Sequence, residues 1–152
     1  MVILIGKTSS GKTLIVNKLI SLHNFKKIVT FTSRPKRKGE KDGVDYHFIT
    51  KEDFKQKIDE GFFAEWKSYV TVEGDWYYGT ALEDLEKAED NSVIILTPDG
   101  FREVKGKLGD SVSSIYIYAN NATIMKRQVL REDDKEEADR RLKDDNKRFK
   151  GI

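Results

Sequence analysis

Residues 6–13, Gly6-Lys7-Thr8-Ser9-Ser10-Gly11-Lys12-Thr13, decide the fold class of this chain. They follow an apolar run at 2–5, which is typical of a buried strand, and a helical pattern begins at Lys12. The glycines let the backbone curl so that successive N–H groups point at one anion, and the helix adds its positive N-terminal end. The stretch therefore predicts a phosphate-binding loop of the form G-x-x-x-x-G-K-[ST].

Two side chains of this loop carry specific chemistry. Lys12 can reach the β- and γ-phosphates of a nucleotide, and the Thr13 hydroxyl is positioned to bind Mg²⁺. The alternative is an ordinary glycine turn with a lysine nearby, which the strand–loop–helix context disfavours. Such a loop does not name a substrate, because GTPases, ATPases and small-molecule kinases share it. The sequence lacks the N-K-x-D motif by which GTPases read guanine, and this favours a small kinase.

The rest of the chain alternates strand-like and helix-like segments. Apolar runs indicate further strands at 28–31, 46–49, 62–69, 76–78, 93–96 and 115–118. Thr50 with Asp53, and Thr80 with Glu83, resemble capping boxes that open helices. The alternation predicts an α/β fold with a parallel sheet flanked by helices.

This pattern also suggests how the domain is organised. Residues 32–80 break the alternation and are expected to form an inserted, mixed α+β region, with an exposed charged loop at 33–45. The charged stretch 131–150 keeps a weak apolar periodicity and predicts a solvated helix. We therefore expect one domain, 1–152. It comprises a core of 1–31 and 81–121, the insertion 32–80 and a helical lid at about 122–145.

Composition limits the function classes. A length of 152 residues, 38% hydrophobic and 36% charged, fits one globular domain. The absence of cysteine excludes disulfides and thiolate metal sites, and two histidines provide no metal cluster. No apolar run approaches a membrane span or a signal peptide, so we expect a cytoplasmic protein without a membrane partner. A net charge of +2 gives no reason to expect a nucleic-acid partner.

A second anion-binding stretch lies at 32–48. Arg34 and Arg37 can both approach one phosphate, each with a planar fork of donors, while Pro35 and the glycines at 39 and 43 favour a fixed, turned loop. Two other readings stay open on these residues alone, namely a solvated charge run and a nucleic-acid or localisation patch.

The same stretch reads T-S-R-P-x-R-x-G-E-x-D-G-x-D-Y-x-F, and after a phosphate loop it resembles the signature of the guanylate kinase family. Members of this family transfer the γ-phosphate of ATP to GMP with Mg²⁺. The resemblance continues through residues 61–66, Tyr78-Gly79-Thr80 and the arginine-rich segment 127–141, so it spans nearly the whole chain.

The resemblance implies a set of nucleotide-binding residues. The loop 6–13 would bind ATP, with Mg²⁺ held by Thr13 and the ATP phosphates. The residues implied to bind the phosphate of GMP are Arg34, Arg37, Tyr46 and Tyr78. Glu65 would accept hydrogen bonds from the guanine N1 and amino groups. The other positions implied to face the acceptor nucleotide are Thr30, Gly79, Thr80 and Asp99.

The resemblance also implies a set of catalytic residues. Arg127, Arg131 and Arg141 resemble lid arginines that close over the ATP phosphates, with Arg140 as the neighbouring alternative to Arg141. Together with Lys12 and Arg34 these arginines would stabilise the migrating phosphoryl group. The expected partners are ATP and GMP, bound by a monomer or a homodimer.

The sequence departs from the family pattern in three places. Thr97 stands where the family commonly has an acid, two positions before the acid matched by Asp99. Residues 70–75 lengthen the predicted hairpin before Tyr78, and the family continues past Ile152 with a further strand and helix. Two alternatives stay open: a catalytically silent interaction module of this type, and a related kinase with another phosphorylated acceptor, including dGMP. The intact phosphate loop argues against the silent module.

Overall fold

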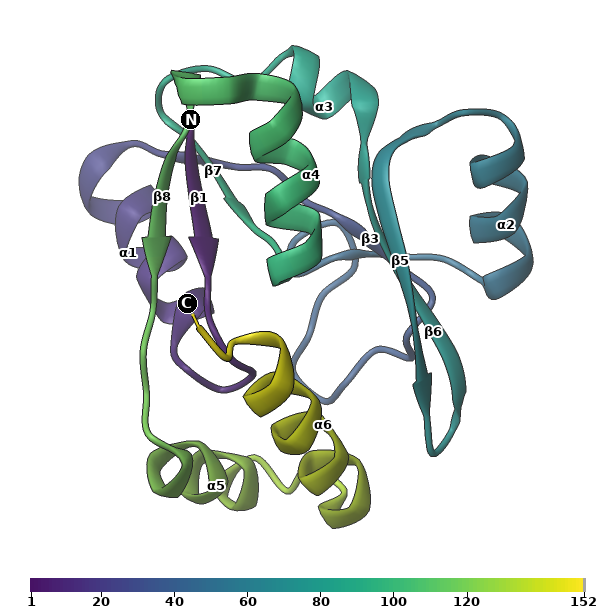
Figure 1. The fold of residues 1–152 in the computed structure, drawn as a ribbon, viewed down its shortest axis with the longest axis vertical. Helices are drawn as coiled ribbons and strands as arrows, with labels where there is room; N and C mark the ends of the chain where they lie inside the picture. The colour runs from purple at the N-terminus through teal and green to yellow at the C-terminus, as the bar shows by residue number, and fades with distance from the viewer. Residues whose placement is uncertain (152) are drawn as a thin grey trace.

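The computed structural model describes residues 1–151, which form two sheets surrounded by helices (Figure 1). The first sheet is wholly parallel, in the order β2-β7-β1-β8. Its strands are β1 (Val2–Ile5), β2 (Lys26–Lys27), β7 (Ser92–Ile95) and β8 (Ser113–Tyr116). The predicted α/β class with a parallel sheet is therefore confirmed.

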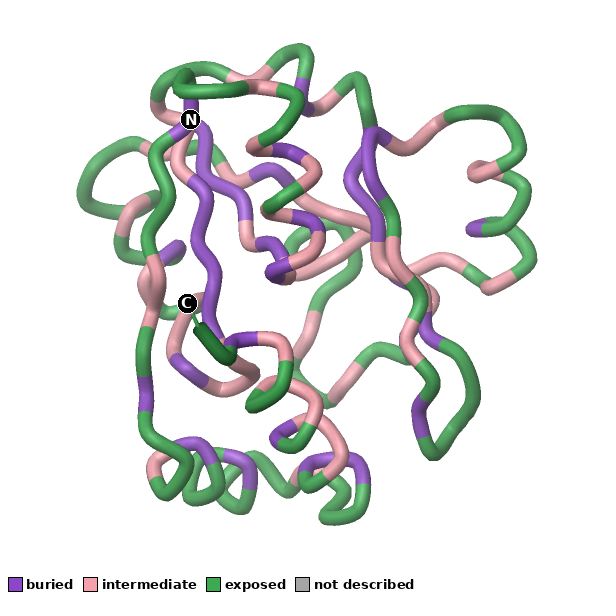
Figure 2. The backbone as a smooth tube through the Cα atoms, viewed as in Figure 1, coloured by how far each residue is buried: buried purple, intermediate pink, exposed green. Residues whose placement is uncertain are grey.

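Two helices pack on opposite faces of this sheet. Ile3 and Ile5 of β1 belong to a core cluster with Val104 of α4 (Pro98–Leu108), whereas Leu4 clusters with Val16 of α1 (Lys12–His23). Successive side chains of a strand point to opposite faces, so the continuous apolar run of β1 is buried on both sides. Figure 2 shows this strand as the buried centre of the molecule.

The second sheet is mixed, in the order β4-β3-β6-β5. Its strands are β3 (Phe31–Thr32), β4 (His47–Phe48), β5 (Phe63–Thr71) and β6 (Gly74–Ala81). The last two form a long antiparallel hairpin. Before the hairpin lies α2 (Lys51–Asp59), whose N-terminus is capped by the Thr50 hydroxyl accepting from the Asp53 N–H at 3.1 Å.

The remaining helices complete the domain. A short α3 (Leu82–Glu86) follows the hairpin, and a 3₁₀ turn, Gly109–Ser111, follows α4. Two helices, α5 (Asn121–Leu130) and α6 (Lys135–Arg148), lie at one end of the molecule, and α6 runs back toward the loop after β1 (Figure 1). The division of the chain into core, insertion and lid stays a prediction.

Three local predictions were wrong. The strand expected at 28–31 is divided between the two sheets: the Ile28 N–H still bonds to Val93 O, but the Thr30 carbonyl already accepts from the His47 N–H. The Thr80 side chain does not cap α3. Thr80 belongs to β6, and its side chain is buried in the protein interior. The charged loop is not wholly exposed, since Arg34 is only 3% exposed.

Within residues 1–151, no helix is both long enough and apolar enough to span a bilayer. The same residues contain no group of three or more His, Cys, Asp or Glu side chains arranged to hold a metal ion.

Candidate active site

The loop between β1 and α1 has the geometry of a phosphate cradle. Gly11 takes a φ of 105°, which L side chains rarely adopt. A Cβ on Gly6 would lie 2.5 Å from the Ile117 carbonyl oxygen, so only glycine fits there. Lys12 folds over the loop and donates to the carbonyl oxygens of Gly6 and Lys7, both at 2.7 Å. Burial lowers the pKa of Lys12 to about 8.

Helix α6 supplies a carboxylate to this cradle. Asp145 Oδ2 accepts from the Thr8 N–H at 2.6 Å, and the Lys7 ammonium donates to Asn146 Oδ1, also at 2.6 Å. Burial raises the pKa of Asp145, although the Thr8 N–H and Lys12 act in the opposite direction. Two donor groups of the loop, the Thr8 N–H and the Lys7 ammonium, are therefore engaged by side chains of α6.

A second anion-binding cluster forms around Arg34. Its guanidinium makes a two-pronged pair with Glu40, at 2.9 and 2.8 Å, and Glu40 also accepts from the Arg37 N–H at 2.8 Å. Burial raises the pKa of Glu40, but these hydrogen bonds outweigh it and the net pKa is lowered. The Arg34 guanidinium lies 5.4 Å from the centre of the Tyr46 ring.

Tyr78 stands beside Tyr46, with ring centres 6.1 Å apart. Burial raises the pKa of both phenols, so both keep their protons at neutral pH and can donate to an anion. Two phenols and two guanidinium groups thus surround one place, which is the donor set that a phosphate requires.

A buried carboxylate, that of Glu65, lies near the start of β5. Glu65 is 7% exposed, and its Oε1 accepts from the Thr80 hydroxyl at 2.6 Å. Burial raises the pKa of Glu65. Thr80 is fully buried, so its hydroxyl is committed to this carboxylate. Glu65 retains a second oxygen for a ligand with paired N–H donors.

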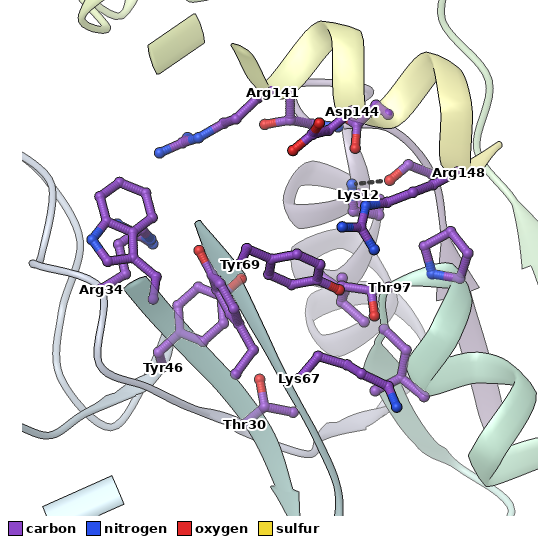
Figure 3. Close-up of a pocket in the computed structure, with 18 of the residues that line it drawn as sticks. Lys12, Thr30, Arg34, Tyr46, Lys67, Tyr69, Thr97, Arg141, Asp144 and Arg148 are labelled. Carbon is purple, nitrogen blue, oxygen red and sulfur yellow. Dashed lines mark hydrogen bonds between the residues drawn. The ribbon is translucent and has the colours of Figure 1, made fainter. Parts of the chain in front are cut away.

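One cavity connects these clusters (Figure 3). The predicted site residues that line it are Gly6, Thr8, Lys12, Thr30, Arg34, Arg37, Tyr46, Glu65, Tyr78, Gly79 and Arg141. A neighbouring pocket is lined by Thr8, Ser9, Lys12 and Thr13, and also by Arg131. The structure thus brings the two predicted anion sites together.

Other predicted site residues stand outside both pockets. These are Lys7, Ser10, Gly11, Thr80, Asp99 and Arg127. Arg127 reaches the loop from α5 and donates to the Ser9 carbonyl at 2.8 Å. Asp99 is bound to Arg102 at 3.0 Å and to Arg148 at 2.8 Å. Its carboxylate therefore belongs to an ion-pair cluster beside the cavity.

Several lining residues were not predicted from the sequence. They include Lys67, Tyr69, Trp76, Asp144, Asp145 and Arg148. Lys67 and Tyr69 share a strand face with Glu65, so strand alternation could have indicated them. The α6 residues lie three, four and seven positions after Arg141, which is the spacing of one helix face. In Figure 3, Arg141, Asp144 and Arg148 reach the cavity from α6.

The fold and this cavity define an α/β protein in which a glycine-rich strand–loop–helix and a cluster of arginines and tyrosines line one cavity. Comparison with known proteins gives the family. The family model "Guanylate kinase" matches residues 1–150, and the chain belongs to the guanylate kinase family.

Individual relatives agree with this assignment. A guanylate kinase of Helicobacter hepaticus is 33% identical over 134 residues, covering 86% of this chain and 65% of the relative. One of Wolinella succinogenes is 34% identical over 148 residues, covering 93% and 67%. The crystal structure of guanylate kinase from Anaplasma phagocytophilum superposes with a TM-score of 0.66 at 28% identity, covering 94% of this chain and 70% of that one. The chain spans 61–65% of the length of the first curated relatives it matches.

Proposed function

We propose that this chain is an ATP-dependent guanylate kinase, which transfers the γ-phosphate of ATP to GMP or dGMP and yields ADP and GDP or dGDP. The observation that carries the proposal is the shared cavity, lined by Lys12 on one side and by Arg34, Tyr46 and Glu65 on the other. Phosphoryl transfer needs two anionic substrates aligned in a site that excludes water, with little covalent work by the protein. Both substrates are cytoplasmic metabolites, in keeping with the expected location.

The donor nucleotide would occupy the loop 6–13. The N–H groups of the loop and the Lys12 ammonium bind its β- and γ-phosphates, once Asp145 has left the Thr8 N–H. Magnesium fits the donor set available: Thr13 is exposed at the pocket, and Mg²⁺ takes few protein oxygens besides phosphate and water. When bound, Mg²⁺ neutralises phosphate charge that develops during transfer.

The acceptor nucleotide would lie along β5 and β6. Arg34 and Arg37 bind its phosphate in place of Glu40, and the phenols of Tyr46 and Tyr78 complete that subsite. Glu65 accepts from the N1–H and 2-amino groups of guanine, since a carboxylate matches two adjacent N–H donors. Thr30, Gly79 and Asp99 would also lie near the acceptor nucleotide.

The arginines of α5 and α6 would close the site. Arg141 lies over the Trp76 ring at 5.1 Å, and Arg131 lines the pocket beside Thr13. Arg127 already contacts the loop through Ser9. Their charge would stabilise the phosphoryl group as it leaves ATP. Lid closure of this kind also excludes water from the site.

The test is an ATP-consumption assay with GMP, dGMP, AMP, UMP and dTMP, with and without Mg²⁺. We expect Mg²⁺-dependent turnover of GMP and dGMP only. Lys12→Met should lower that turnover by about 100-fold or more, because a transition-state cation is lost. Lys18→Met, an exposed change on the same helix, is the control and should have no effect.

The assay also separates the alternatives. Turnover of AMP alone would overturn the role of Glu65, because adenine presents an acceptor at N1. Binding of GMP without turnover of any nucleotide would favour the silent interaction module. A Lys12→Met protein that works at the normal rate would overturn the role of the phosphate loop.

A further inference from the structure

Gly100 lies unusually close to Glu65. It sits in the first turn of α4, where its N–H is accepted by the capping Thr97 hydroxyl at 3.2 Å. A Cβ placed on Gly100 would stand 2.9 Å from Glu65 Oε2 and 3.3 Å from Glu65 Cδ. Real Cβ atoms essentially never approach another atom within 3.0 Å, so any larger residue would force one of the two groups to move.

The helix itself gives no reason for a glycine at position 100. Glycine is the poorest helix former after proline, so a helical glycine suggests a close approach. Gly106, in the same helix, offers the contrast: it is exposed, and a Cβ there would meet nothing within 4 Å. Of these two glycines, only Gly100 is required by a neighbouring side chain.

The Glu65 carboxylate is held from two directions. Thr80, fully buried on β6, donates to Oε1 at 2.6 Å, and Gly100 leaves the space that Oε2 occupies. Thr97 limits that space further, because its hydroxyl lies 3.3 Å from the same Cβ position. The orientation of the Glu65 carboxylate therefore depends on the Thr80 hydroxyl at Oε1 and on the absence of a side chain at Gly100 beside Oε2.

We propose that Gly100 is a positioning residue that sets guanine specificity, by leaving the room in which Glu65 faces the N1–H and 2-amino groups of the acceptor. The inference rests on the proposed function, because it takes Glu65 as the guanine-reading carboxylate. A methyl group at position 100 displaces Oε2, the oxygen that Thr80 leaves to the ligand, and so turns the carboxylate away from the two N–H donors of the base edge.

Calorimetric titration of GMP and IMP tests this inference. IMP lacks the 2-amino group, so it depends on only one of the two hydrogen bonds to Glu65. We expect Gly100→Ala to weaken GMP binding roughly 10- to 100-fold, the effect of losing a hydrogen bond to a charged group. IMP should weaken less, so the preference for GMP over IMP shrinks. Gly106→Ala, the matched control, should bind both nucleotides as the wild type does.

Thermal unfolding separates positioning from a structural role. Alanine favours the helix, so Gly106→Ala should unfold at a higher temperature than the wild type. A Gly100→Ala protein that binds GMP normally, with its preference over IMP intact, overturns the inference while leaving the proposed function standing. A wild-type protein that binds no GMP overturns the proposed function, and the inference falls with it.

If the Gly100→Ala protein does not fold, the same change is tested in the Glu65→Ala variant. Glu65→Ala removes the atoms that the new methyl group would meet, so Gly100→Ala should fold and unfold normally in that background. Non-additivity of the two changes supports direct contact between the two residues. If the double variant still fails to fold, the conflict lies elsewhere and the inference is wrong.

Discussion

The two anion sites of the cavity both hold a carboxylate of the chain itself, but the carboxylates come from very different places. Glu40 is six residues from Arg34, in the same loop. Asp145 is 137 residues from Thr8, on α6. The cluster around Arg34 is thus held by a contact within one loop. The phosphate loop is held by a contact that depends on how α6 packs.

The two sites are therefore preorganised in different ways, one by a contact within its own loop and the other by a contact with a distant helix. The Arg34–Glu40 pair braces the loop 33–45 from within, and Lys27 of β2 adds a contact from the core by donating to the Val44 and Asp45 carbonyl oxygens. The Thr8–Asp145 bond couples the donor loop to α6, so a phosphate entering that loop must also release the helix. On the proposed function, a phosphate of the nucleotide would replace an internal carboxylate in both places. Until then the internal carboxylates keep the Arg34 guanidinium and the Thr8 N–H hydrogen-bonded.

The largest expected effect comes from breaking the local pair. Arg34→Met leaves Glu40 without its main partner, and it should lower the free energy of unfolding by about 2 kcal/mol, less than for a fully buried pair because Glu40 reaches water. GMP turnover should fall by about 100-fold or more. Chemical unfolding and the ATP-consumption assay measure the two effects.

Arg37→Met is the matched control for that change. Arg37 meets Glu40 through its backbone N–H, so its side chain can be removed without breaking the pair. Turnover should fall while stability stays near that of the wild type. An equal loss of stability in both variants would contradict the special role of the Arg34–Glu40 pair.

A smaller and opposite effect is expected at the donor loop. Asp145→Ala removes the carboxylate from the Thr8 N–H, and ATP should then bind about tenfold more tightly, since no internal anion competes. Titration with ATP measures the affinity. Asp139→Ala, an exposed change on the same helix, should leave it unchanged. Unaltered ATP affinity in Asp145→Ala would show that the contact does not restrain the loop.

The smallest effect concerns pH. Because burial lowers the pKa of Lys12 to about 8, the amine loses its charge above that pH and ATP affinity should fall a few-fold between pH 7.5 and 9. Stability should move the other way: the unfolded chain holds this proton up to the ordinary lysine pKa of 10.5, so unfolding becomes less favourable as pH rises from 8 to 10.5.

Unfolding of the wild type and of Lys12→Met at pH 7.5 and 9.5 isolates this contribution. The difference in stability between the two proteins should shift in favour of the wild type at the higher pH. A difference that is the same at both values would mean that Lys12 does not titrate in this range.

The strand, loop and helix of the proposed donor site could be predicted from the sequence, because their residues are contiguous. Eight consecutive residues carry the glycines, the lysine and the hydroxyl, and the strand before them and the helix after them lie where the hydrophobic pattern indicates. The residues of the proposed acceptor site are dispersed over the segment 30–46, the strands β5 and β6, and α4. Residues such as Glu65 could be indicated only through resemblance to a family, since one glutamate in a strand has no signature of its own.

The contacts that could not be predicted form only when separate elements pack together in the folded chain. Asp145 and Asn146 lie in a charged run that a sequence pattern assigns to solvent, and only the docking of α6 brings them to the loop. The buried state of Arg34 was missed for a similar reason, because the pairing with Glu40 is a property of the folded loop. Thr80 was misassigned because a cap and a buried strand hydroxyl look alike in sequence.

The contacts of α4 with β5 have a mechanical consequence. Lys107 donates to the Ala64 carbonyl, Lys67 pairs with Glu103, and Gly100 abuts Glu65, so the Glu65 end of β5 is attached to α4 of the parallel core. The loop that carries Arg34 is attached to the same core at another place, where Lys27 of β2 donates to the Val44 and Asp45 carbonyl oxygens at 2.7 and 3.0 Å. If the site closes on its ligands as proposed, both attachments would have to bend, so they would set how far the second sheet can turn toward the phosphate loop.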